Sequence, residues 1–322
     1  MIRTATSGDL RVSQNGFAAT LEVLVLAERQ ESPGRSVTFE GNEVSIAGDA
    51  ASLFRLEANV AECAVTDNVL SVVGSADAET FIGCFTAPEL QGLDMLVAGN
   101  DVSVPRGNIT VQVHRLQRLG QSAESTATIE DNRFVTAGRL YVEVWENDSL
   151  DPVLRGNTVD AAGVRVRGIG ATLVANVVTH RAEGLLYLSI GDGLHVELTD
   201  NEFTKVGASS PTAAAVRLVY DDKEGTLAMS GNVLRDQYMP LDLSLRVTDF
   251  TATVNDNVFD FPITAPPQAG RFFACCESQA HLDLRGNRWG DVEDADTLLT
   301  LLELGTSGEA VMEVLLEPLK TE

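Results

Sequence analysis

A pattern of apolar and polar positions recurs along the chain, first as LRVSQNGF at residues 10–17. An Asn stands at its sixth position, with one apolar residue three positions earlier and another two positions later. Aligning the segments on this residue gives eleven copies, at Asn15, Asn42, Asn68, Asn100, Asn132, Asn157, Asn176, Asn201, Asn232, Asn257 and Asn287. Both flanking columns are apolar in every copy, and the residue directly before the Asn is mostly Gly or Asp, which suits a tight bend.

A second alternating run lies between successive copies, as in ITVQVHRL at 109–116 and LDLSLRV at 241–247. Alternation with a period of two predicts a strand with one buried face. Each repeat of 19 to 32 residues therefore holds two or three short strands and no helix. Stacked repeats place each strand beside its counterpart in the next coil, so the apolar columns form ladders in the core. The Asn amides stack as well, each donating to one neighbour and accepting from another.

The last part of the chain departs from the repeat. Asn287, Trp289 and Gly290 predict a corner, followed by an amphipathic helix around 294–304 and a closing strand before Pro318. Its apolar positions are Leu298, Leu299, Leu301 and Leu302, and its N-terminal acids, which complement the helix dipole, are Asp291, Glu293, Asp294 and Asp296. We expect this cap, 291–322, to cover the open end of the coils at 1–290 within one domain.

The repeat and the ending GNRWGDVEDADTLLTLLELG resemble the right-handed parallel β-helix superfamily of pectate-lyase-like repeat proteins, over essentially the whole chain. The resemblance implies an all-β, right-handed parallel β-helix of about eleven coils with a short C-terminal capping helix; the usual hand of parallel crossovers agrees. Enzymes on this fold act on polysaccharides. The chain lacks the polygalacturonase-like Asn-Thr-Asp, Gly-His-Gly and Arg-Ile-Lys set, and none of its four histidines lies between two glycines.

Composition narrows the range of partners. Lys and Arg number 23 against 47 Asp and Glu, a net charge of −24, which disfavours nucleic acid and strongly acidic polysaccharides and would attract Ca²⁺. No apolar run is long enough to span a bilayer, and MIRTATSGDL lacks the apolar region of a signal peptide. Secretion or surface display is expected only if the chain is part of a longer protein. The four cysteines, Cys63, Cys84, Cys275 and Cys276, are too few for a disulfide scaffold, and we interpret them as packing residues.

The second strand of each repeat offers a candidate binding face. We expect its inward residues to be Val111, Val142, Val166, Leu188, Leu218 and Leu243. The outward neighbours then include Gln112, His114, Tyr141, Glu143, Trp145, Arg165, Arg167, Tyr187, Ser189, Arg217, Asp242, Ser244 and Arg246. Of these we select Tyr141, Glu143, Trp145, Arg165, Arg167 and Tyr187 as candidate ligand-binding residues. Such a polar face with aromatics suits a sugar chain, and the alternative is a solvated face with Glu–Arg pairs between coils.

Candidate acid–base groups are fewer. Glu143 and Asp242 lie four coils apart, about 19 Å, whereas glycoside hydrolysis requires about 5–9.5 Å between its carboxyl groups. Aligning 188–192 with 218–222 stacks Asp192 on Asp222, with Asp221 nearby. This predicts either a Ca²⁺ site at Asp192, Asp221 and Asp222 or catalytic carboxylates drawn from Asp192, Asp222 and Glu143. The alternative is that these acids are turn residues facing water.

These observations favour a non-catalytic scaffold or recognition module in a surface, secreted or phage-like assembly. The alternative is a polysaccharide hydrolase or lyase acting from the outer face of the second strands, and a passive adhesion domain is a third interpretation. We expect no cofactor other than Ca²⁺. The partners we expect are a carbohydrate and, because no amphipathic cap precedes the first coil, either a second copy of the chain or an N-terminal domain covering that coil.

Overall fold

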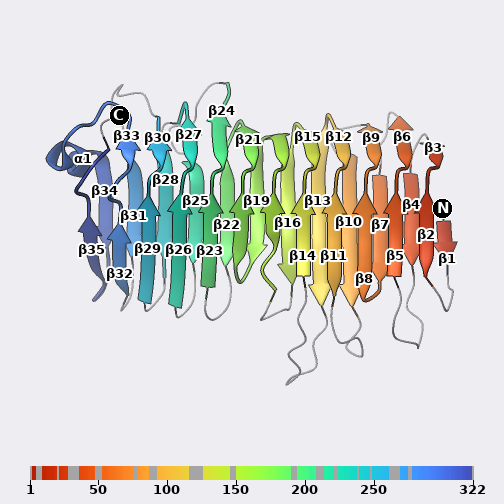
Figure 1. Ribbon diagram of the computed structural model, residues 1–322, viewed down its shortest axis with the longest axis horizontal. Helices are drawn as coiled ribbons and strands as arrows, with labels where there is room; N and C mark the ends of the chain where they lie inside the picture. Colours follow the sequence, from red (N-terminus) through yellow and green to blue (C-terminus); the bar gives the residue numbers. More distant parts are fainter. Residues whose placement is uncertain are drawn as a thin grey trace, which may run out of the picture. The chain divides into compact units, whose positions relative to one another are not determined.

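The computed structural model describes 2–4, 9–19, 22–27, 36–47, 53–74, 78–86, 93–115, 126–145, 150–189, 194–207, 214–220, 224–237, 239–246, 249–260, 269–274 and 278–320. The chain divides into two compact units, Met1–Gly168 and Ile169–Glu322. Each unit is a parallel β-helix in which successive strands join three different sheets in turn (Figure 1). The predicted all-β parallel solenoid is therefore confirmed within each unit.

The first unit contains three parallel sheets, here called A1, B1 and C1. Sheet A1 contains β1 (Ile2–Thr4), β4 (Glu22–Ala27), β7 (Leu53–Asn59), β10 (Ala78–Thr86), β13 (Gly107–Arg115), β16 (Arg139–Trp145) and β19 (Gly163–Gly168). Sheet B1 contains β2 (Leu10–Ser13), β5 (Ser36–Glu40), β8 (Glu62–Thr66), β11 (Asp94–Ala98), β14 (Thr126–Glu130) and β17 (Val153–Arg155). Sheet C1 contains β3 (Gly16–Ala19), β6 (Glu43–Ala47), β9 (Val69–Val73), β12 (Asp101–Val104), β15 (Arg133–Thr136) and β18 (Thr158–Ala161).

The second unit repeats this plan in sheets A2, B2 and C2. Sheet A2 contains β22 (Leu185–Ser189), β25 (Ala214–Tyr220), β28 (Met239–Leu245), β31 (Gly270–Ala274) and β34 (Leu302–Thr306). Sheet B2 contains β20 (Ala171–Val174), β23 (Leu194–Thr199), β26 (Glu224–Ser230), β29 (Asp249–Asn255), β32 (Gln279–Asp283) and β35 (Val311–Leu315). Sheet C2 contains β21 (Val177–His180), β24 (Glu202–Lys205), β27 (Val233–Arg235), β30 (Val258–Phe259) and β33 (Arg288–Trp289).

The apolar columns seen in the sequence form the core. Val97 of β11 lies in register between Val65 of β8 and Ile129 of β14, and all three side chains are buried. Leu198, Met229 and Val254 form the corresponding buried column of sheet B2. Because alternate residues of each strand face inward, in-register stacking places apolar side chains on their own counterparts.

The bend before each ladder Asn has left-handed backbone geometry. Its residue has a φ between 53° and 70° at all eleven positions, namely Gln14, Gly41, Asp67, Gly99, Asp131, Gly156, Ala175, Asp200, Gly231, Asp256 and Gly286. Gly, Asn and Asp adopt this conformation at the lowest cost, which explains why Asp and Gly dominate the column.

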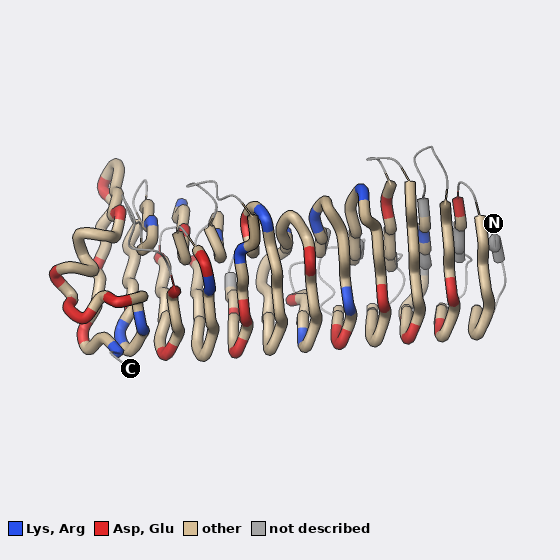
Figure 2. Tube along the Cα trace, turned by 90° about the horizontal axis from the view of Figure 1, so that it is seen from above, with Lys and Arg blue, Asp and Glu red and all other residues tan. Residues whose placement is uncertain are grey.

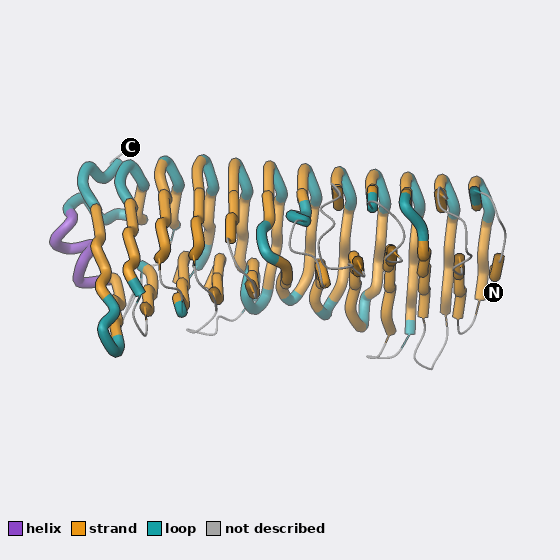
Figure 3. Tube along the Cα trace, turned by 90° about the horizontal axis from the view of Figure 1, so that it is seen from below, coloured by secondary structure: helices purple, strands orange, loops and turns teal. Residues whose placement is uncertain are grey.

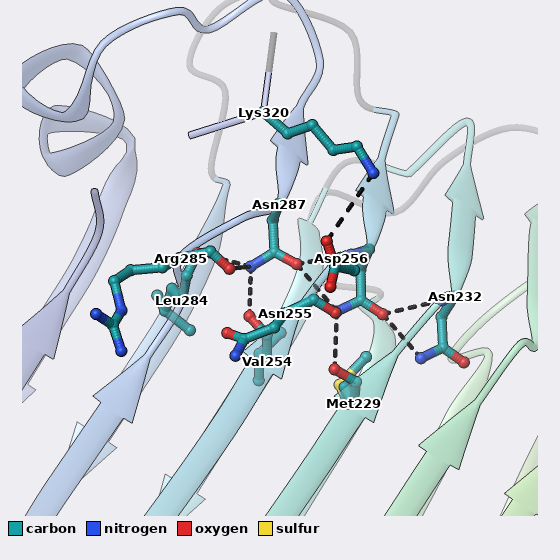
Figure 4. Close-up of polar contacts among 10 residues, drawn as sticks. Met229, Asn232, Val254, Asn255, Asp256, Leu284, Arg285, Asn287 and Lys320 are labelled. Atoms are coloured by element: carbon teal, nitrogen blue, oxygen red, sulfur yellow. Dashed lines mark hydrogen bonds and ion pairs between the residues drawn. The ribbon is translucent and has the colours of Figure 1, made fainter. Parts of the chain in front are cut away.

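The predicted Asn ladder is present as two runs, one in each unit. Nδ2 of Asn68 donates to Phe39 O at 2.9 Å and to Oδ1 of Asn100 at 2.9 Å. The same Oδ1 accepts the backbone N–H of Asn68 at 3.0 Å. Figure 4 shows the C-terminal end of the run in the second unit, where Asn232, Asn257 and Asn287 repeat this arrangement. The amides thus satisfy both their own polar groups and those of the bend.

The C-terminal helix is shorter than the sequence predicted. Helix α1 spans Ala295–Leu301, and the chain continues directly into β34. Asp294 lies at the helix N-terminus, as expected, and is its N-cap, accepting the backbone N–H of Thr297 at 2.7 Å. Among the residues of α1 only Leu298 is buried, so the helix covers less of the coil end than we expected. Within the described ranges, no helix has the length and apolarity needed to cross a membrane.

Two of the four cysteines form a disulfide, contrary to the expectation that all four are unpaired packing residues. Cys63 of β8 and Cys84 of β10 are joined across the interior of the first unit, and both are buried. Their spacing of 21 residues carries no recognisable motif, but it places both side chains on inward positions of strands in different sheets. Cys275 and Cys276 lie outside the described residues.

Candidate functional site

The outward face of sheet A1 carries a continuous column of aromatic and polar side chains. It consists of one residue from each of five neighbouring strands, in register: Arg55, Phe81, Thr110, Tyr141 and Arg165. On β16, both neighbours of Tyr141, Leu140 and Val142, are buried in the core. Tyr141 therefore points away from the core, and so do its counterparts on the other four strands.

A second polar column runs beside the first, two residues further along each strand. Gln112, Glu143 and Arg167 are paired in register on β13, β16 and β19. These positions confirm the predicted inward phase of Val111, Val142 and Val166, which are buried. The structure thus brings four of the predicted binding residues together, namely Tyr141, Glu143, Arg165 and Arg167.

The first column has an Arg at each end, an aromatic residue next to each Arg, and Thr110 at its centre. The guanidinium carbon of Arg55 lies 5.1 Å from the ring centre of Phe81, a cation–π contact. The rings of Phe81 and Tyr141 and the side chain of Arg165 are half-buried. Nε of Arg165 is buried and has no hydrogen-bond partner among the described residues. A buried N–H without an acceptor is costly, so this donor is suited to a ligand oxygen.

The outward face of sheet A2 is a charge ladder of different character. Leu186, Arg217, Asp242, Arg271 and Glu303 are in register on its five strands. Asp242 accepts Nε of Arg271 at 3.0 Å, and Nε of Arg217 lies 3.3 Å from Oδ2 of the same carboxylate. The carboxylate side chain is 2% exposed because the two guanidinium groups cover it. Its hydrogen bond with Arg271 raises the pKa of that guanidinium group. Sheet A2 thus has ion pairs between coils, as in the alternative we gave, but they are Asp–Arg pairs around a buried carboxylate and not Glu–Arg pairs on a solvated face.

The predicted phase was wrong for one strand. We expected Leu188 to face inward and Tyr187 to belong to the binding face, but Tyr187 is fully buried and Leu188 is half-exposed. Tyr187 packs against Tyr220, with ring centres 6.2 Å apart, and Tyr220 packs against Phe250 at 5.0 Å. The segment Leu-Leu-Tyr-Leu is apolar on both faces of the strand, so alternation does not fix its orientation. The packing of the three tilted rings does.

Several predicted residues lie outside what the structure describes. Asp192, Asp221 and Asp222, proposed as a Ca²⁺ site or as catalytic carboxylates, fall in segments that are not described. The backbones of His114 and Trp145 pair between β13 and β16, but their side chains are likewise outside the description. Among the residues that are described, no group of three or more His, Cys, Asp or Glu is arranged to hold a metal ion. The Ca²⁺ site and the catalytic carboxylates stay predictions.

The second unit contains a buried polar cluster that the sequence analysis did not predict. Nε2 of His180 lies 3.1 Å from Nε2 of Gln237, and its Nδ1 lies 2.9 Å from Ala182 O. His180 therefore donates from Nδ1 and accepts at Nε2 as a neutral ring, and burial lowers its pKa to about 4. Burial also lowers the pKa of Lys205, whose Nζ donates to Arg181 O at 3.3 Å.

Gln237 stabilises its bend with side-chain hydrogen bonds, in the same way as a ladder Asn stabilises the bend that precedes it. Its Nε2 donates to Arg235 O at 2.6 Å and to Phe203 O at 3.2 Å, and the preceding Asp236 has a φ of 57°. The sequence signal is an Asp followed by an amide residue, the combination that marks several of the Asn bends. The cluster is packed within the fold, and we assign it a structural role.

A small polar cavity lies beside the chain end in the second unit. Its volume is about 220 Å³, and it is lined by Asp260, Arg288, Gly290, Asp291, Val292, Glu293 and Lys320. Lys320 also reaches Asp256 of the neighbouring bend, with Nζ 3.9 Å from Oδ1 (Figure 4). All its charged lining residues are exposed, so the cavity has the solvated, mixed-charge character of the surrounding surface.

Comparison of the chain with protein-family models, with curated proteins and with solved structures gave no match.

Proposed function

We propose that the protein is a non-catalytic recognition module of the right-handed parallel β-helix superfamily, and that it binds an extended, uncharged carbohydrate chain on the outward face of sheet A1. The observation that carries the proposal is the in-register column Arg55, Phe81, Thr110, Tyr141 and Arg165. Parallel strands about 4.8 Å apart repeat the contact group at regular intervals, as an extended polymer requires.

The chemistry of the column suits sugars. Aromatic rings provide flat apolar surfaces for the C–H faces of a pyranose, and guanidinium groups provide several N–H donors for hydroxyl oxygens. Arg165 contributes a buried Nε that lacks an acceptor, which a ligand hydroxyl would supply. The net charge of −24 favours an uncharged glycan over an acidic one.

The disulfide supports action outside the cytoplasm. Disulfides persist in oxidising compartments and are rare in the reducing cytosol. The Cys63–Cys84 bond is thus consistent with a secreted or surface-displayed assembly, in which a glycan is an accessible ligand.

The test uses the full chain on a broad glycan array with Ca²⁺ present, followed by titration calorimetry of the best ligand. We expect Tyr141→Ala and Arg165→Ala each to weaken binding by tenfold or more, and Tyr141→Phe to retain most of it. Arg133→Ala is the matched control, because Arg133 lies on sheet C1 in an exposed pair with Asp101. No binding on the array, or equal binding by these variants, would exclude the proposal.

A reducing-sugar assay and absorbance of unsaturated products separate recognition from catalysis. We expect neither signal on the glycans that bind. Release of new reducing ends or unsaturated sugars would instead establish the competing hypothesis, a hydrolase or lyase, and would direct attention to Glu143, Asp192 and Asp222.

A further inference from the structure

The last coil of the second unit ends in two strands, each with an open edge. β34 is the terminal strand of sheet A2, and β35 is the terminal strand of sheet B2. Within the part of the chain that the structure describes, no strand pairs with the far edge of either. Figure 3 shows α1 beside the last coil.

The backbone of β35 offers regular hydrogen-bonding groups at this edge. The N–H of Val311 donates to Ser278 O at 2.8 Å, and Leu315 O accepts the N–H of Leu284 at 2.8 Å. In a parallel ladder alternate residues bond to the same neighbour, so Val311, Glu313 and Leu315 face β32. The N–H and C=O groups of Met312 and Val314 therefore point toward the open edge.

The apolar core is also uncovered at this end. Met312 and Val314 continue the inward columns of Ala280 and Leu282, which are buried, yet they are themselves half-exposed. In sheet A2, Phe272 is fully buried, whereas its in-register neighbour Leu304 is 41% exposed. Core columns that end in solvent favour the addition of a further layer, as terminal coils of solenoids require.

The charges around this end indicate what that layer is. Figure 2 shows acidic positions gathered around α1 and the last coil, and they comprise Asp291, Glu293, Asp294, Asp296, Glu303, Glu309, Glu313 and Glu317. A second copy pairing antiparallel across β35 would oppose Glu313 to its own counterpart, and like charges directly opposite destabilise a sheet. A cationic segment is complementary, although Glu313 already contacts Nδ1 of His281 at 2.9 Å.

We propose that the free edge of β35 binds an extended segment of a partner protein in which apolar residues alternate with Lys or Arg. The segment adds as the next strand of sheet B2 and bonds to the backbone of Met312 and Val314. Its apolar side chains cover Met312 and Val314, and its cationic side chains lie beside Glu313 on the outer face. The period of two in the segment follows from the period of two in β35.

The experiment titrates the full chain into fluorescently labelled peptides of alternating lysine and valine, or alternating glutamate and valine. We expect the lysine peptide to bind, with an affinity that falls as salt rises, and the glutamate peptide to fail. Binding should slow amide hydrogen exchange at Met312 and Val314. Equal binding of both peptides, or exchange unchanged at these two amides, would overturn the proposal.

Two variants of β35 make the test specific. Val314→Pro removes an N–H that points away from β32, so we expect an unchanged melting temperature and at least tenfold weaker binding of the lysine peptide. Glu313→Lys should transfer the preference to the glutamate peptide, whereas Glu43→Lys, at an exposed position of β6, should not. Retention of the lysine preference by Glu313→Lys would contradict the proposal. Micromolar self-association in sedimentation would also contradict it, because a second copy would then occupy the edge.

Discussion

At most of the bends before the ladder residues, Asp and Gly alternate from one coil to the next, and the contacts at Gly99 and Gly231 give a steric reason. A Cβ on Gly99 would lie 2.4 Å from Oδ1 of Asp67, and one on Gly231 would lie 2.1 Å from Oδ1 of Asp200. The carboxylate of one coil therefore occupies the space above the bend of the next. Glycine at these two positions provides both the positive φ and the missing volume. The sequence shows that Gly and Asp share this column, but the reason for their order appears only in the contacts.

Substitution of a buried Asn inside the ladder should cost much more stability than substitution of the exposed Asn at its end. Asn232 is fully buried, donates to Leu198 O at 2.7 Å and accepts the N–H of Asn201 at 2.9 Å. Asn232→Ala leaves both backbone groups unsatisfied, so we expect a loss of about 3 kcal/mol in the free energy of unfolding. Urea denaturation followed by circular dichroism measures it.

The control for that prediction is Asn15→Ala, at the exposed start of the other run. Solvent replaces the lost bonds there, so we expect a cost of about 1 kcal/mol or less. Equal losses for the two variants would show that burial of the ladder amides does not determine their contribution.

His180 should make stability depend on pH between about 4 and 6.5. Its folded pKa is lowered from 6.5 to about 4, mainly by burial. Above pH 6.5 the ring is neutral in both states, and this contribution to stability is complete. As the pH falls from 6.5 toward 4, the unfolded chain binds a proton that the folded chain does not, so about 3 kcal/mol of stability is lost.

His180→Gln removes this titration and keeps an acceptor for Gln237. We expect the difference in unfolding free energy between the native protein and the variant to shrink as the pH is lowered from 7 to 4. Urea denaturation at several pH values measures it, and Lys205 and Glu183, the neighbouring charges, are present in both proteins. A difference that does not vary with pH would contradict the lowered pKa.

At the scale of strands, the charge ladder of sheet A2 should stabilise the fold through its central carboxylate. Asp242→Ala removes a nearly buried group and leaves Arg217 and Arg271 beside each other without their shared partner. We expect a loss of about 2 kcal/mol, because breaking a largely buried pair leaves uncompensated charge. Thermal unfolding of the variant measures it.

The matched control is Asp101→Ala, which breaks the exposed pair with Arg133 on sheet C1. Side chains 57% and 47% exposed are well solvated without each other, so we expect less than about 0.5 kcal/mol. A loss at Asp242 no larger than this would mean that the covered carboxylate is not a stabilising element.

The strands and their registers could be read from the sequence wherever one face is polar. Val111, Val142 and Val166 alternate with polar neighbours, which fixed the phase of β13, β16 and β19 and hence the position of Tyr141 and Arg165. β22 is apolar at both phases, so the packing of Tyr187 on Tyr220 could not be derived. Asp242 was expected on an exposed face, and only the three-dimensional arrangement shows the two arginines that cover it.

At the scale of the whole molecule, the proposed glycan face and the proposed docking edge belong to different units. The face belongs to sheet A1 of the first unit, and the edge belongs to sheet B2 of the second. They also differ in chemistry, since one offers aromatic and guanidinium groups to an uncharged polymer and the other offers backbone groups and carboxylates to a basic strand. If both proposals hold, one chain would carry a carbohydrate-binding surface and a protein-binding surface.

The disulfide makes the free energy of unfolding depend on whether the surroundings are oxidising or reducing. Cys63 and Cys84 close a loop of 21 residues, which restricts the unfolded chain and contributes about 3 kcal/mol in the loop-entropy description. We expect Cys63→Ser combined with Cys84→Ser to lower the free energy of unfolding by about this amount. Dithiothreitol should have the same effect on the native protein and none on the double variant. Alkylation with mass spectrometry, before and after reduction, measures the thiols directly. Free thiols at both positions in protein folded under oxidising conditions would contradict the bond and remove the support it gives to a secreted or surface location.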